Sequence, residues 1–354
     1  MAEYKNNDEK LIETVQTAFY IISIFSILLM GFLFLFSEYI FDKIFHFNNI
    51  EMWFKYFFIS SILLIASSRF FLSIINGFKN TKIYSLTILS GSIISIIVTY
   101  PLIHLYGLYG AFTTLLINYI AQSIYLFLLL KRTTIFKKDF FKYRYSSDIL
   151  GKYLNYALMF IVSALTIPIV HILIRNMVGD SFSEIDVGYW EALMKISNLY
   201  MTFIGVFLTI YYLPHLSEKS DYQIVIEAKR FFKILFIFLI FVFTFVFIFK
   251  YYVITILFSN DFLIVSKYIY IQQIGDFFKL LSFIFGYVII VKMWTKIYII
   301  FEIFHSILFT VLGYYFIYNS DGFYGASIAY SLSYFIHFLI NVSIFYNFQK
   351  KVVS

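Results

Sequence analysis

The chain of 354 residues contains no cysteine, and its charged residues amount to only 13%. The absence of cysteine excludes a disulfide framework, thiolate metal sites and cysteine catalysis. Soluble domains carry about 25% charged residues, so the scarcity of charge argues against a soluble fold. Hydrophobic residues make up 61% instead, in long runs such as 18–36 and 234–249. Since a helix needs about 20 apolar residues to cross the ~30 Å hydrocarbon core, we expect an all-α polytopic membrane protein.

The apolar runs predict about ten transmembrane helices. The expected spans are 17–37, 53–76, 84–106, 109–130, 153–175, 187–213, 232–258, 266–291, 297–318 and 322–346. The connections between them are short, except for 131–152 and 214–231. The polar first ten residues lack the basic start and short apolar core of a cleavable signal peptide. If Met1 is the true start of the protein, the first span is expected to act as its own insertion signal.

Lysine and arginine are distributed unevenly between the two sides of these spans. With the N-terminus inside, the inner side holds nineteen of them and the outer side five. The five outer residues are Lys43, Lys55, Arg175, Lys250 and Lys267. Basic residues are retained on the cytoplasmic side of a membrane, so both termini are predicted to be cytoplasmic.

Two short motifs recur in order along the chain. TKIY occurs at 81–84 and 295–298, and GLYGA at 107–111 returns as GFYGA at 322–326, with offsets of 214 and 215 residues. In both copies the first motif is an inner loop and the second an outer turn. Parallel repeats of this kind are typical of transporters built from two similar bundles.

The repeat divides the chain into two helical bundles. We expect a four-helix N-terminal bundle over 1–130, a basic cytoplasmic linker over 131–152, and a six-helix C-terminal bundle over 153–354. The linker is interpreted first as a positive-inside anchor, and the alternative is recruitment of anionic lipid head groups.

Ionisable side chains inside the predicted spans are the main indication of function. Each costs at least ~2.5–3.5 kcal/mol at a helix centre, so such groups tend to face partners or water-filled cavities. Arg69 has no acidic residue within a turn and is the best single candidate for binding an anion. Arg175 lies at the outer mouth, where snorkelling to water is the default expectation.

Three pairs of ionisable residues share helical faces, because their members lie three or four positions apart. They are Glu191 with Lys195, Asp276 with Lys279 (Gln272 shares that face), and Glu302 with His305. One interpretation is that each pair neutralises itself, and it is favoured for the third pair. The other is that Asp276 or Glu191 senses a coupling cation, since a carboxylate in a low-dielectric cavity can exchange protons near neutral pH.

Pro168 falls in the middle of the span 153–175, where it removes a backbone donor and is expected to kink the helix. A broken helix is tolerated where it lines a cavity or is buried in protein. Pro101 stands similarly within 84–106. A simple packing kink is the alternative at both positions.

Signatures of other function classes are missing from the sequence. It shows no metal-binding cluster, no nucleotide-binding glycine loop and no nucleophile elbow, so we expect no metal, no cofactor and no catalytic residues. Membrane glycosyltransferases and sugar polymerases usually need a large outer loop, whereas the longest here is about fifteen residues around 38–52. The net charge of +7 is explained by topology, so nucleic-acid binding is not supported.

Several stretches resemble the O-antigen translocases, including lipid III flippases, of the multidrug/oligosaccharidyl-lipid/polysaccharide exporter superfamily. They are ALMFIVSALTIPIVHILIRN (157–176), GYWEALMKISNLY (188–200), YYLPHLSE (211–218), LFSNDF (257–262) and QQIGDFFKLLSFIFGYVIIVK (272–292). The opening AEYKNNDEKL (2–11) resembles the loop after that family's second helix. The similarity extends over essentially the whole chain and is clearest from 157 to 300.

This resemblance implies a flippase for undecaprenyl-diphosphate-linked oligosaccharide in the bacterial inner membrane, working by alternating access. Family cations that meet the lipid diphosphate would correspond here to Arg69, Arg175, Lys195 and Lys279, although Arg69 falls outside the clearest stretches. The partners implied are the lipid-linked substrate, membrane lipids and polysaccharide polymerase machinery. The competing functions are a small-molecule or drug antiporter of the same superfamily and a membrane enzyme of polysaccharide assembly.

Members of that family usually have twelve helices, whereas ten are predicted here. At the repeat offset of about 215 residues, the spans 153–175 and 187–213 would have copies ending just before Met1. We therefore expect a complete transporter to carry one further N-terminal helical hairpin.

Overall fold

The structure is a computed structural model, and it describes residues 8–40, 52–78, 80–130, 138–142, 144–320 and 322–353. Within these ranges the chain forms helices joined by turns, and no strand occurs. Ten helical segments are long and apolar enough to cross a membrane. They match the ten predicted spans one for one, and the prediction of an all-α polytopic membrane protein is confirmed.

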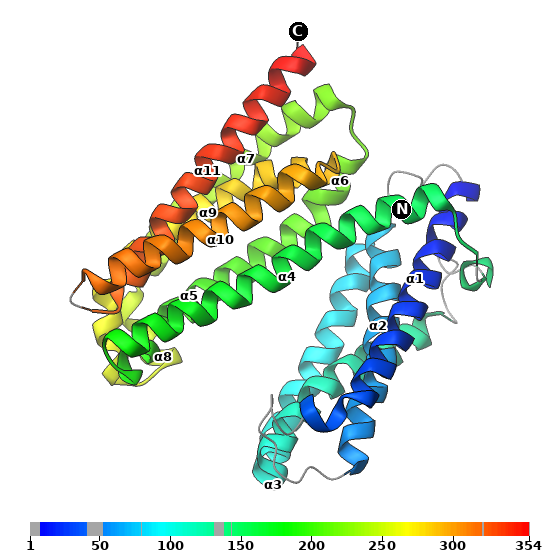
Figure 1. Ribbon diagram of the computed structural model, residues 1–354, viewed down its shortest axis with the longest axis horizontal. Helices are drawn as coiled ribbons and strands as arrows, with labels where there is room; N and C mark the ends of the chain where they lie inside the picture. The colour runs from blue at the N-terminus through cyan, green and yellow to red at the C-terminus, as the bar shows by residue number, and fades with distance from the viewer. Residues whose placement is uncertain are drawn as a thin grey trace. The chain divides into compact units, whose positions relative to one another are not determined.

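The chain forms two compact units, Met1–Tyr153 and Leu154–Ser354. Figure 1 draws the first from blue to teal and the second from green to red. The division into bundles at 1–130 and 153–354 with a linker between them stays a prediction, because residues 131–137 and 143 of the linker lie outside the described ranges.

The N-terminal unit is built from α1 (Asp8–Leu35), α2 (Met52–Gly77) and α3 (Thr81–Leu130). The third of these is a hairpin of two spans, Thr81–Gly107 and Tyr109–Leu129. The chain reverses at Gly107, whose φ of 55° and ψ of −126° are open to glycine and strained for other residues. Ser95 donates a hydrogen bond to the Thr114 carbonyl across the hairpin, which joins its two arms.

A short 3₁₀ turn, η3 (Lys138–Phe141), packs on α1 within this unit. Phe140 is fully buried there, in a cluster with Val15 and Phe70. The Gln16 side chain donates to the Asp139 carbonyl at 2.8 Å, and the Tyr153 hydroxyl donates to the Thr14 carbonyl at 3.2 Å. Within the predicted linker, η3 thus packs on α1 and is hydrogen-bonded to it.

The two GxYGA motifs have the same structural role in both units. Gly110 lies so close to the carbonyl of Leu102 that an added Cβ would overlap it, and Gly325 stands in the same relation to the carbonyl of Phe316. Both TKIY motifs begin a helix, at Thr81 and at Thr295. The predicted internal repeat therefore marks equivalent helix starts and equivalent tight turns.

The C-terminal unit contains the remaining elements. They are α4 (Ser147–Ser181), α5 (Glu184–Phe207), the π-helix η4 (Leu208–Tyr212), α6 (Leu213–Ser217), α7 (Asp221–Ile248), α8 (Lys250–Leu257), the 3₁₀ helix η5 (Asn260–Lys267), α9 (Ile269–Val291), α10 (Thr295–Tyr318) and α11 (Tyr324–Val353). Helix α9 contacts α5, α7, α10 and α11, so it is the central helix of this unit. In Figure 1 it lies between α7 and α10.

Two apolar clusters fill the ends of the C-terminal unit. One surrounds Trp190, Ile317 and Tyr330, near the connection between α10 and α11. The other surrounds Leu216, Ile224 and Phe348, where α6, the start of α7 and the end of α11 meet. The polar groups described below lie along the helices between these clusters.

The long connection predicted over 214–231 is mostly helical, since α6 and the first part of α7 fall within it. Helix α7 begins at Asp221, eleven residues before the predicted span, and a capping box between Ser220 and Gln223 fixes its start. Ile224, Val225 and Ala228 are buried at helical spacing, which makes this first part amphipathic. The same predicted span also breaks at Phe249, where α8 follows α7.

Candidate functional site

Polar side chains form a stripe along the central helix α9. Gln272, Asp276, Lys279 and Ser282 follow one another at intervals of four, three and three residues, so they share one face. Helix α11 presents a matching stripe of Tyr330, Tyr334, His337 and Asn341. Because α9 and α11 pack against each other over much of their length, these stripes create a polar interior within a membrane-spanning bundle.

Asp276 is the most enclosed charged residue among the described ones, with no solvent-accessible surface. Its carboxylate accepts hydrogen bonds from the hydroxyls of Ser197 at 2.6 Å and Tyr330 at 2.8 Å, and a short one from Tyr200. These donors come from α5 and α11, so the carboxylate joins three helices. Buried polar groups need such partners, since an unsatisfied one costs free energy comparable to its desolvation.

Lys279 is half-buried and has no carboxylate within ion-pair distance among the described residues. Its ammonium lies 4.8 Å from the ring centre of Tyr334 and 5.5 Å from that of Tyr330. Cation–π contacts of this kind attract an ammonium without neutralising it. The interpretation of Asp276 and Lys279 as a direct intrahelical ion pair therefore does not describe this structure.

Two histidines lie beside Lys279. The ring of His305, on α10, is 4.8 Å from that of His337 and 4.4 Å from that of Tyr334. His305 is buried, and its Nε2 atom has no hydrogen-bond partner. His337 lies within 3.3 Å of the Ser282 hydroxyl and of the Asn341 amide.

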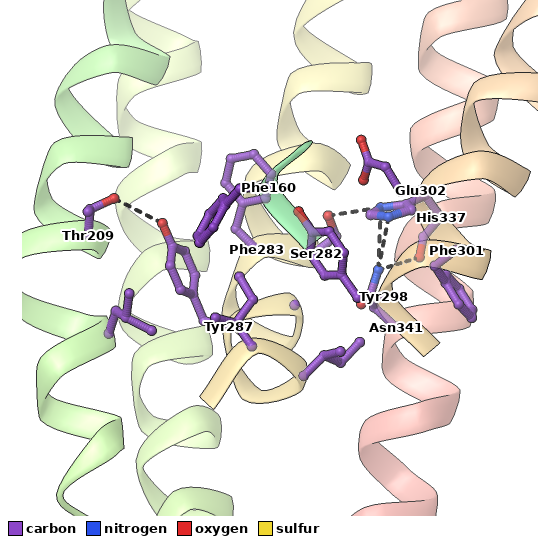
Figure 2. A pocket seen from close by; sticks show the side chains of 14 residues that line it. Phe160, Thr209, Ser282, Phe283, Tyr287, Tyr298, Phe301, Glu302, His337 and Asn341 are labelled. Carbon is purple, nitrogen blue, oxygen red and sulfur yellow. Dashed lines mark hydrogen bonds between the residues drawn. The ribbon is translucent and has the colours of Figure 1, made fainter. Parts of the chain in front are cut away.

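A cavity of about 250 Å³ opens next to these histidines. Figure 2 shows Glu302, His337 and Asn341 on one side of it, and the hydrogen-bonded pair Thr209 and Tyr287 on the other. Four further aromatic residues line it, Phe160, Phe283, Tyr298 and Phe301, together with small and aliphatic residues. All of these residues belong to the C-terminal unit.

Glu191 and Lys195 are not an ion pair in this structure. The nearest basic partner of Glu191 is His171 on α4, whose Nδ1 atom is 3.9 Å from its Oε1 atom. The His171 ring packs on Trp190 at 4.7 Å. Lys195 and Arg175 are exposed on the surface of the unit.

Arg69 lies in the N-terminal unit, on α2, and its side chain is exposed there. Its guanidinium is 5.0 Å from the ring centre of Tyr119 on the second arm of α3. Within the described residues it has no carboxylate partner. Pro168 lies inside α4, which is assigned as one helix from Ser147 to Ser181, and the predicted kink stays a prediction.

Of the predicted site residues, the structure brings Asp276, Lys279, Glu302 and His305 into one neighbourhood. The sequence reasoning missed Tyr200, Tyr330, Tyr334, His337 and Asn341, which complete it. The last four recur at intervals of four, three and four along a predicted span, and this polar stripe was a readable signal. Among the described residues, no three His, Asp or Glu side chains are placed so that they could hold a metal ion.

This chain resembles known proteins both in sequence and in fold. The chain is 25% identical to the lipid III flippases of Escherichia coli K12 and Shigella flexneri over 290 residues, which is 81% of this chain and 69% of each relative. Its fold matches an outward-facing multidrug resistance MATE transporter of the MOP superfamily, with a TM-score of 0.81 and 15% identity over 96% of this chain and 79% of that one.

A second solved structure is equally similar. It is a MOP superfamily transporter from Pyrococcus furiosus, also with a TM-score of 0.81 and 15% identity, matched over 98% of this chain and 82% of that one. At this identity the two structures show a shared MATE-like fold. The family described as "Polysaccharide biosynthesis protein" matches residues 4–267, about three quarters of the chain. The protein is therefore a multi-pass membrane protein that belongs to this polysaccharide biosynthesis family.

Proposed function

We propose that this protein is a flippase that moves undecaprenyl-diphosphate-linked oligosaccharide, of the O-antigen or common-antigen type, across the bacterial inner membrane. Its family and its similarity to lipid III flippases support a transporter of lipid-linked sugar rather than an enzyme. Ten spans and a polar interior agree with that role, because sugars and diphosphate cannot cross hydrocarbon without shielding. Transport would proceed by alternating access between the two units.

The observation that carries the proposal is the state of Lys279. Its ammonium lies inside a membrane-spanning bundle, against two tyrosine rings and without an ion-paired carboxylate among the described residues. A fixed cation in a low-dielectric environment attracts an anion strongly. A diphosphate supplies the missing negative charge, so we assign Lys279 to that group. Arg69, Arg175 and Lys195 are proposed as further cations for it along the transport path.

Flipping of undecaprenyl-diphosphate-linked oligosaccharide in proteoliposomes tests this assignment. Lys279→Ala is expected to lower the flipping rate by more than about 100-fold. Lys279→Arg keeps the positive charge and should retain part of the flipping rate. Lys250→Ala is the matched control, because Lys250 also lies over aromatic rings, at 4.5 and 5.4 Å, but at the start of α8. Equal loss in Lys250→Ala, or normal flipping in Lys279→Ala, contradicts the role of Lys279.

The same vesicles separate the competing functions. Efflux of an organic cation dye without flipping of lipid-linked sugar would favour a drug antiporter. Hydrolysis or transfer of the sugar by the purified protein would favour an enzyme.

We further propose that Asp276 or Glu191 couples transport to a cation gradient. Asp276 is supported by its enclosure among three hydroxyls, and Glu191 by its contact with His171. Flipping by Asp276→Asn or by Glu191→Gln should lose its dependence on a proton or sodium gradient. If both variants keep the gradient dependence of the unmodified protein, these carboxylates are structural.

The proposed function also implies the surroundings of the protein. We place it in the inner membrane with both termini in the cytoplasm, in contact with membrane lipids. The oligosaccharide delivered outside would be taken up by polysaccharide polymerase machinery, which we propose as a partner.

A further inference from the structure

The cavity of the C-terminal unit has a composition that the diphosphate assignment leaves unused. Its described lining contains one carboxylate, that of Glu302, and no lysine or arginine. Its volume of about 250 Å³ is at the small end of ligand pockets. The lining residues are partly exposed in places, among them Phe160, Tyr287 and Tyr298, so the cavity is reachable from outside the bundle.

Aromatic rings form much of the wall. Phe160, Phe283, Tyr287, Tyr298 and Phe301 come from α4, α9 and α10, and they converge on one small volume. The face of an aromatic ring carries partial negative charge. It therefore attracts the slightly positive C–H groups that cover the flat faces of a sugar ring.

Hydrogen-bonding groups occupy the two sides of the cavity. Glu302, His337 and Asn341 lie on one side, while Tyr287 and Thr209 form a 3.0 Å hydrogen bond on the other (Figure 2). Thr209 belongs to the π-helix Leu208–Tyr212, and such local widening of a helix occurs often at functional sites. A carboxylate, an amide, an imidazole and hydroxyls together match the alternating donors and acceptors of a sugar.

We propose that this cavity binds one uncharged sugar ring, the first sugar of the lipid-linked oligosaccharide. The inference rests on the proposed function, since the ring enters as part of that substrate. The Lys279 ammonium lies 4.8 Å from the ring centre of Tyr334, and the Tyr334 ring lies 6.0 Å from that of His337 in the cavity lining, so the cavity adjoins the group assigned to the diphosphate. The first sugar is bonded directly to that diphosphate. Because Glu302 is the one charged group in the described lining, a neutral or N-acetylated sugar is accepted and a uronic acid is disfavoured.

Gly286 provides a way to fill the cavity without disturbing the helix. A Cβ atom there meets only the Asn341 Oδ1 atom, at 4.0 Å, so Gly286→Ala is tolerated. The larger side chain of Gly286→Leu projects into the space that the sugar would occupy. Gly205→Leu is the matched control, because Gly205 has nothing within 4 Å of an added Cβ and does not line the cavity.

The experiment measures binding of three lipids to the purified full chain. They are undecaprenyl diphosphate alone, the same lipid bearing N-acetylglucosamine, and the same lipid bearing glucuronic acid. N-acetylglucosamine should tighten binding to the unmodified protein about tenfold over the sugar-free lipid, through a few hydrogen bonds and stacking. Gly286→Leu should abolish this gain and leave the affinity for the sugar-free lipid unchanged, whereas Gly286→Ala and Gly205→Leu should retain it. Glucuronic acid should add affinity only in Glu302→Gln.

Each result bears on a different claim. Equal affinity for the lipid with and without N-acetylglucosamine, or a gain that survives in Gly286→Leu, overturns the sugar site and leaves the flippase proposal standing. Absence of binding for all three lipids overturns the proposed function and this site with it.

Discussion

The two units of this protein treat a charge inside a span in opposite ways. In the N-terminal unit, Arg69 is exposed on α2 and contacts a single tyrosine ring. In the C-terminal unit, Asp276 is fully enclosed on α9 and accepts hydrogen bonds from three hydroxyls. The difference follows from packing, since α2 contacts α1 and α3 whereas α9 contacts α5, α6, α7, α10 and α11. An ionisable residue in a span becomes part of a polar network only where its helix is central.

The two units nevertheless share the repeat motifs. The largest expected effect is in membrane topology, where equivalent motifs should lie on the same side of the membrane. The chain has no cysteine, so single introduced cysteines can be labelled without background. Lys82→Cys and Lys296→Cys, in the two TKIY motifs, should react only with a reagent that reaches the cytoplasm. Tyr106→Cys and Asn319→Cys, at the opposite ends of the same helices, should react with an impermeant reagent added to intact cells. Opposite labelling of Lys82→Cys and Lys296→Cys would refute the parallel repeat.

The next largest effect should separate the two charges by stability. Asp276→Ala leaves the hydroxyls of Ser197, Tyr200 and Tyr330 without their acceptor, and the free energy of unfolding should fall by about 3 kcal/mol. Arg69→Ala removes an exposed side chain and should change it by about 0.5 kcal/mol or less. Thermal unfolding in detergent measures both. Similar losses in the two variants would show that exposure does not distinguish them.

A smaller and equal effect is expected at the repeated turns. Gly110→Ala and Gly325→Ala each force a Cβ into the carbonyl of the preceding helix, and each should lower the free energy of unfolding by about 2 kcal/mol. Gly31→Ala and Gly205→Ala are matched controls in the two units, since nothing lies within 4 Å of a Cβ at either position. They should be neutral or stabilising, because alanine favours a helix. A loss at only one of the two turns would break their equivalence.

The smallest effect should come from Glu191. Its contact with His171 is 3.9 Å long, and the two side chains are 28% and 38% exposed. Glu191→Gln should therefore change the free energy of unfolding by about 0.5 kcal/mol or less, even though it lies in a span like Asp276. A loss as large as that of Asp276→Ala would place Glu191 in a buried network that this structure does not contain.

The sequence by itself determined the number of spans, the positions of the ionisable residues and the repeat. Hydrophobic runs long enough to cross a bilayer are a local property of the chain, so ten spans could be read directly. The repeated glycines were equally readable as motifs. The amphipathic helix at the start of α7 was not predicted. Its polar residues interrupt the apolar run, although Ile224, Val225 and Ala228 are buried at helical spacing.

Tertiary structure alone decided which of the ionisable residues share a site. Helical spacing predicted the pairs Glu191 with Lys195 and Asp276 with Lys279. In the structure, Glu191 and Asp276 contact residues of other helices instead. Ser197 and Tyr330 reach Asp276 from 79 and 54 residues away in the sequence. Spacing along one helix shows which side chains share a face, but the partner of that face is set by how distant helices pack. The polar interior of the C-terminal unit and its cavity exist only through that packing.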